Sequence, residues 1–184
     1  MTWMGLLLAI MGCSSWAGPS SVPVSAAALV LDPGQGVLEQ DGHLFSGTSV
    51  EHYPSGQLRE RASYLNGKRE GLREHWYPEG QRSSEAPYVA GKQSGVKRTW
   101  YDNGVLRSQG LLVAGVPHGT QRQWYVSGAL FKELNLEMGV ETGLQRAWRE
   151  NGAIYNNYEV VNGRSFGLRR SKLCVELVDG EWSE

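Results

Sequence analysis

Four tryptophans recur at a spacing of 24 residues, and an arginine stands two positions before three of them. The tryptophans are Trp76, Trp100, Trp124 and Trp148, and the arginines are Arg98, Arg122 and Arg146, with Arg170 next in their series. Indole rings and guanidinium groups stack on one another, and both residue types dominate the energetics of protein interfaces. The stripe is therefore a candidate site for a protein partner. The alternative is structural, with the rings covering the core of a sheet and the arginine stems lying along them.

Patterns that would indicate catalysis or metal binding are missing from the sequence. Its four histidines are scattered, and none stands at a metal-ligand spacing from Cys, Asp or Glu: His43, His52, His75 and His118. Several acidic residues are expected on a solvated strand face, with no column of paired acids: Glu60, Glu74, Glu85 and Glu133. No nucleophile elbow, phosphate-binding loop or dinucleotide fingerprint occurs. We expect a protein that is not an enzyme, with no catalytic residue, no metal and no cofactor.

The charge balance argues against nucleic acid as a partner. The chain carries 18 Lys and Arg against 19 Asp and Glu, a formal net charge of −1. Such a chain offers no basic field that could hold a phosphate backbone through counterion release.

Glycines share the 24-residue period and predict the elements that position the stripe. One glycine column is expected to form structural turns, namely Gly56, Gly80, Gly104, Gly128 and Gly152. Between Gly95 and Ala114 polar and apolar residues alternate on both sides of Asp102-Asn103-Gly104, which is typical of a β-hairpin. A type I turn followed by a left-handed glycine would place Trp100 opposite Leu106.

Strict alternation along both strands predicts one apolar and one polar face. On the apolar face we expect the tryptophan and arginine columns together with Leu58, Leu106, Leu130 and Ile154, and with Tyr64, Tyr88, Leu112, Leu136 and Val160. A single layer cannot bury this face by itself, so the sheet is expected to curl on itself, to be covered by the chain's own tails, to pair with a second copy or to receive a partner.

The pattern Gly-x-x-x-x-Trp-Tyr-x-x-Gly resembles the MORN-variant repeat found in YwqK-type antitoxins, over about residues 43–170. The resemblance implies an all-β fold, an elongated single-layer antiparallel sheet of five to six stacked 24-residue hairpin repeats. The expected units are 43–66, 67–90, 91–114, 115–138, 139–162 and a partial unit 163–172. The first unit, with His43 and His52 at a glycine and a tryptophan position, is expected to act as a cap. Residues 173–184 are expected to close the other edge.

The N-terminus predicts export. Met4 to Gly12 is an apolar run of signal-peptide length, and Gly12-Cys13-Ser14 resembles a lipobox, so residues 1–13 are expected to be a signal with lipid attached to Cys13. Ser14 after the cysteine implies sorting to the outer membrane in a Gram-negative cell. Cleavage after Ala17, giving a secreted or periplasmic protein, and no processing at all are the alternatives. Residues 14–42, rich in Ser, Ala, Pro and Gly, are expected to be a tether, with docking of residues 26–31 as an edge strand the alternative.

Three functions from different classes fit these features. The first is a non-catalytic scaffold for protein–protein interaction in the cell envelope, attached to the membrane through its lipid. The second, implied by the resemblance, is an antitoxin or immunity-type protein that binds and neutralises a toxin. The third is a structural envelope protein.

Overall fold

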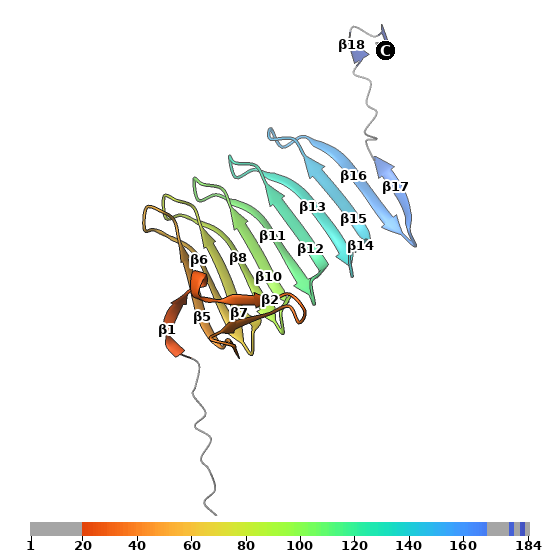
Figure 1. Cartoon of the computed structure of the whole chain (residues 1–184). Coiled ribbons are helices and arrows are strands. Elements are labelled where there is room, and N and C mark those ends of the chain that lie inside the picture. The colour runs from red at the N-terminus through yellow and green to blue at the C-terminus, as the bar shows by residue number, and fades with distance from the viewer. Residues whose placement is uncertain (1–19, 169–176, 179–180, 183–184) are drawn as a thin grey trace, which may run out of the picture.

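A computed structural model describes residues 20–168, 177–178 and 181–182 of the 184-residue chain, mostly as β-strands (Figure 1). Among these residues no helix is long and apolar enough to cross a membrane. The elements are β1 (Ser20–Ser25), the 3-10 helix η1 (Ala26–Ala28), β2 (Val30–Asp32), β3 (Val37–Gln40), β4 (His43–Leu44), β5 (Gly47–His52), β6 (Leu58–Leu65), β7 (Lys68–Trp76), β8 (Arg82–Val89), β9 (Lys92–Gln93), β10 (Gly95–Trp100), β11 (Leu106–Val113), β12 (Val116–Trp124), β13 (Leu130–Glu137), β14 (Val140–Glu141), β15 (Gly143–Trp148), β16 (Ile154–Val161), β17 (Arg164–Leu168), β18 (Leu177–Val178) and β19 (Glu181–Trp182).

Fourteen strands form one large sheet, in which consecutive hairpins from β5 to β17 lie side by side as a long twisted ribbon (Figure 1). The pairing is antiparallel throughout, except that β1 runs parallel to β5 at the first edge. The predicted all-β sheet of stacked hairpins is therefore confirmed.

Two kinds of turn alternate along the ribbon. At one end of the strands a three-residue loop ends in a left-handed glycine: Gly104 has φ 81°, and the amide of Tyr101 donates to the carbonyl of Val105 at 2.9 Å. This turn and the pairing of Trp100 with Leu106 confirm the predicted hairpin. At the other end are two-residue turns such as Ala114-Gly115, in which both residues have positive φ (51° and 90°), as in a type I′ turn.

Every hairpin also contains a β-bulge that the alternation did not predict. Trp100 opposes Leu106, whereas the preceding Thr99 opposes Ser108, so Arg107 is an extra residue on β11. The same shift occurs beside His52, Trp76, Trp124 and Trp148. Because an extra residue reverses the alternation beyond it, the rest of the second strand turns its side chains to the opposite faces.

The predicted division into an apolar and a polar face is therefore wrong in part. We call the side that carries the four tryptophans and Arg98, Arg122 and Arg146 the tryptophan face. The column Tyr64, Tyr88, Leu112, Leu136 and Val160 lies on the other side, the tyrosine face, because Leu112 follows the bulge. The buried residues of the array lie mainly on the tyrosine face: Ser49, Ala62, Tyr64, Ala86, Tyr88, Gln145, Ala147, Tyr158 and Val160.

Residues 20–42 fold against the array, so the predicted tether is corrected from Ser20 onward. Strand β1 joins the main sheet, while β2, β3 and β4 form a separate three-stranded sheet. Leu38 packs on a cluster formed by Phe45, Ala62 and Tyr64, and its amide donates to the carbonyl of Gly67 at 2.8 Å. This sheet covers the N-terminal end of the tyrosine face, because apolar side chains between residues 24 and 38 pack against the cluster there.

At the C-terminal end, β18 and β19 pair with each other, Leu177 opposite Trp182, in a two-stranded sheet of their own. The predicted closure of the open edge by residues 173–184 is therefore not seen in the described part of this segment. A pairing between residues five apart closes a much shorter loop than docking onto the main sheet would, and its entropic cost is lower.

Candidate functional site

A row of charged side chains crosses the tryptophan face from strand to strand. Directly opposed residues along it are Arg61, Glu74, Glu85, Arg98, Gln109, Arg122, Glu133 and Arg146, on strands β6 to β15. We call this set the arginine–glutamate row. Opposed residues on neighbouring strands lie within side-chain reach, so the register itself creates the ion pairs.

Each carboxylate of the row contacts two guanidinium groups. Arg122 Nε and Arg146 Nη2 lie 2.8 and 2.7 Å from the two oxygens of Glu133. Glu85 is bound in the same way by Arg98 and by Arg82, a residue next to the row. Arg82 also reaches Glu74, which Arg61 contacts from the other side. The carboxylates are therefore nearly buried beneath arginines that remain open to solvent, with side chains 4–13% exposed against 39–49%.

The pKa of Glu133 shows whether burial or the neighbouring arginines have the larger effect on its carboxylate. Burial alone raises this pKa, but the hydrogen bonds from Arg122 and Arg146 outweigh burial and hold it below the ordinary carboxyl value. Glu133 is therefore ionised at neutral pH. The expectation that Glu74, Glu85 and Glu133 belong to a solvated face is wrong, because arginines enclose them.

The row has one neutral member, Gln109. Arg98 Nε donates to Gln109 Oε1 at 3.3 Å, where the equivalent contact elsewhere is a carboxylate. With Arg82, the row and its neighbour contain five arginines and three glutamates, and the excess positive charge flanks Gln109 at Arg98 and Arg122. Among the described residues, Arg122 bonds only through its Nε atom.

The four tryptophans lie beside the row and are partly buried. Guanidinium groups lie over three of the rings: Arg61 over Trp76 at 5.6 Å, Arg82 over Trp100 at 6.0 Å and Arg146 over Trp148 at 5.4 Å. The predicted stacking is thus confirmed for Arg146 alone. Arg98 and Arg122 point to carboxylates instead, and Trp124 has no arginine over it in the described part of the chain.

The alternation could not identify Arg61, Glu85 and Glu133 as members of the site, because these residues follow the bulge. Their signal is the column Arg61, Glu85, Gln109, Glu133 and Asn157, again 24 residues apart, which lies opposite the arginine column only once the bulge is known. The structure places the predicted tryptophans and arginines on one face. Cys13 and Arg170 lie outside the described residues.

Tyrosines on the tyrosine face link consecutive hairpins, a role the sequence did not suggest. The hydroxyls of Tyr53, Tyr77, Tyr101 and Tyr125 each donate to the carbonyl of the tryptophan 23 residues later, at 2.8–2.9 Å. These bonds fix the spacing of the tryptophans. The series ends where Arg149 replaces the tyrosine.

The described residues contain no group of three or more His, Cys, Asp or Glu that could hold a metal ion. One histidine, His75, lies beside an acid, with its Nε2 3.3 Å from Glu60. Burial, with Arg73 nearby, lowers its pKa, so His75 is neutral at physiological pH. Arg73 satisfies the Glu60 carboxylate with two hydrogen bonds, and the group is a structural ion pair.

Comparison with known families finds a match for part of the array. Residues 45–66, 69–90 and 93–113 match the MORN repeat variant. Three consecutive segments are thus similar to MORN-variant repeats. The third contains Arg98, Trp100 and Gln109, and the hairpins beyond it, which carry Trp124 and Trp148, repeat its register and its bulge. No curated protein matches the chain. MORN repeats are a non-enzymatic repeat type that commonly serves as an interaction module.

Proposed function

We propose that this protein is a non-catalytic scaffold of the cell envelope that holds a protein partner on its tryptophan face. The observation that carries the proposal is the row of partly exposed tryptophans beside an excess of arginine. Trp and Arg are the residues that most often supply the energy of protein interfaces. The position of Gln109 specifies the partner further, because a carboxylate there would complete the pattern set by Glu85 and Glu133.

The proposed partner segment is acidic and extended, with one carboxylate seated between Arg98 and Arg122. Gln109→Glu supplies that carboxylate from the protein itself and should displace the partner. Gln123→Glu is the matched control, since Gln123 is exposed on the tyrosine face of the next strand, opposite Ser108, and adds the same charge. Affinity capture from envelope extract with quantitative mass spectrometry identifies the partner, and calorimetry then measures its affinity for the three proteins.

The affinity should fall at least about tenfold in Gln109→Glu and stay unchanged in Gln123→Glu. Equal affinities for all three proteins would contradict the proposed face. Trp124→Ala gives a second measurement. A partly exposed ring that contacts a partner should lose about 2 kcal/mol of binding with little loss of stability, whereas a core ring would lose roughly 3–5 kcal/mol of stability.

The envelope location rests on the apolar N-terminal run and on Cys13. Intact mass after membrane extraction tests it: the expected N-terminus is a lipidated Cys13, and an N-terminus at Gly18 or Met1 would contradict it. A captured partner that is toxic, and whose toxicity the protein suppresses, would narrow the proposal to an antitoxin or immunity function. Concentration-dependent self-association lost in Trp124→Ala would make a second copy the partner.

A further inference from the structure

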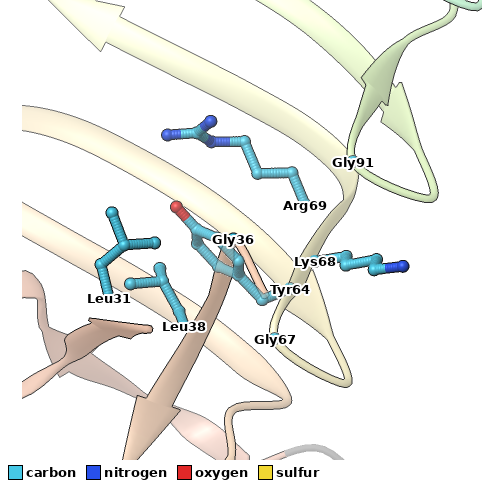
Figure 2. A pocket seen from close by; sticks show the side chains of 8 residues that line it. All are labelled: Leu31, Gly36, Leu38, Tyr64, Gly67, Lys68, Arg69 and Gly91. Atoms are coloured by element: carbon cyan, nitrogen blue, oxygen red, sulfur yellow. The ribbon is translucent and has the colours of Figure 1, made fainter. Parts of the chain in front are cut away.

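A cavity of about 280 Å³ lies between the N-terminal sheet and the first repeats, on the tyrosine face and away from the arginine–glutamate row (Figure 2). Leu31 and Leu38 form its apolar wall, and Tyr64, Lys68 and Arg69 line the other side. In Figure 2 the guanidinium of Arg69 and the hydroxyl of Tyr64 point to the same side as Leu31, whereas Lys68 points away.

Arg69 forms no ion pair with a described residue, although its charge acts on Glu60 from beyond ion-pair distance. Its guanidinium lies over the rings of Tyr64 and Tyr88, at 5.9 and 5.6 Å. Its Nε atom is buried without a hydrogen-bond partner, and the described part of the chain offers the group no ion pair. Glu60, the acid on which the charge of Arg69 acts, is already bound by Arg73. A buried donor without a partner is costly, and a ligand that accepts its hydrogen bonds would gain accordingly.

Tyr64 provides a second donor. The residue is 8% exposed, yet its hydroxyl makes no hydrogen bond to any described residue. Tyr88, on the other side of Arg69, differs, because its hydroxyl accepts a hydrogen bond from Gln93 at 2.8 Å. Of the two tyrosine hydroxyls beside Arg69, the one that faces the cavity therefore lacks a partner among the described residues.

We propose that this cavity binds a small aliphatic carboxylate. The carboxylate accepts hydrogen bonds from Arg69 and from the Tyr64 hydroxyl, and the hydrocarbon chain lies against Leu31 and Leu38. A neighbouring cavity of about 190 Å³ shares Leu38, Tyr64 and Arg69 but is lined by Glu51 and Glu60, which repel an anion. The acid-free cavity therefore receives the charged group.

Calorimetry with octanoate, and with 1-octanol as the uncharged probe, tests the site on the full chain. Octanoate should bind saturably and at least about tenfold more tightly than 1-octanol, since a hydrogen bond to a charged group contributes more binding energy than one between neutral groups. Tyr64→Phe should weaken octanoate binding about tenfold or more, and Arg69→Met at least as much. Tyr88→Phe, the matched control with its hydroxyl already bonded, should bind as the unchanged protein does.

Thermal unfolding separates binding from folding. Without ligand, Tyr64→Phe should unfold at the same temperature as the unchanged protein, because the hydroxyl it loses has no partner there. Octanoate should raise the unfolding midpoint of the unchanged protein, since a ligand that binds only the folded state stabilises it. No saturable octanoate binding, equal binding of octanoate and 1-octanol, or equal losses in Tyr64→Phe and Tyr88→Phe would overturn the proposal.

Discussion

Replacing Glu133 by glutamine tests whether the arginine–glutamate row stabilises the array. The carboxylate binds Arg122 and Arg146 and is 12% exposed, whereas the two arginine side chains are 45% and 39% exposed. A fully exposed ion pair contributes up to about 1 kcal/mol, and breaking a buried one costs about 3–5 kcal/mol. In Glu133→Gln, water solvates the exposed guanidinium groups of Arg122 and Arg146 and so replaces part of the interaction that they lose. Glu133→Gln should therefore lower the free energy of unfolding by about 1–2 kcal/mol.

The chain contains its own control, because Gln109 already occupies the equivalent place between Arg98 and Arg122. Glutamine is thus sterically acceptable in the row, and the stability lost in Glu133→Gln measures the effect of the carboxylate's charge. The reverse change, Gln109→Glu, should raise stability by about 0.5–1 kcal/mol, since it places a carboxylate between two arginines. The double variant should lie within about 1 kcal/mol of the unchanged protein.

Urea denaturation at several pH values checks these differences. The folded-state pKa of Glu133 is lowered, so its contribution is present above the unfolded-state pKa, near 4.5, and is lost as the pH falls through the folded-state pKa. The gap between Glu133→Gln and the unchanged protein should therefore be full at pH 7 and close at low pH. Equal stability at pH 7, or a gap that does not change with pH, would refute the reasoning.

Three further changes probe the hairpins, each by urea denaturation. Tyr101→Phe removes the hydrogen bond to the carbonyl of Trp124 and should cost about 1 kcal/mol; an unchanged midpoint would mean that the bond between hairpins contributes nothing. Gly104→Val should cost about 1–3 kcal/mol, because Gly104 has a positive φ at which a β-branched residue is strained; an unchanged midpoint would contradict the turn. Ala114→Asn should stabilise by about 0.5–1 kcal/mol, because asparagine tolerates its left-handed conformation better; destabilisation would contradict the type I′ turn.

The sequence predicted the parts of the fold that depend on local conformation. A left-handed glycine leaves a direct mark in the sequence, so the turn at Gly104 and the pairing of Trp100 with Leu106 could be predicted from one hairpin. The bulge at Arg107 leaves no such mark, because any residue type can occupy it. Alternation continued across the bulge therefore assigned Leu112 to the wrong face.

The site was predicted in part for the same reason. The tryptophans and arginines precede the bulge, and their common face follows from alternation alone. Their acidic partners follow the bulge on the second strand, so alternation assigned Glu133 to the solvated face although Arg122 and Arg146 enclose it. The fold of residues 20–42 was missed because their composition is that of a linker, while burial of Leu38 against Tyr64 depends on residues distant in the sequence.

Departures from the period say more about function than the period does. Positions that repeat unchanged, such as the turn at Gly104, are explained by the geometry that every hairpin shares. Gln109 departs where its column has Glu85 and Glu133, and the departure leaves two arginines with surplus charge on an exposed face. Arg69 likewise stands opposite Tyr64 at the end of the array where the N-terminal sheet packs, and it makes no ion pair with a described residue there. Shared hairpin geometry explains neither charge, and at both proposed binding sites the positive charge of arginine exceeds the acidic charge that is bonded to it.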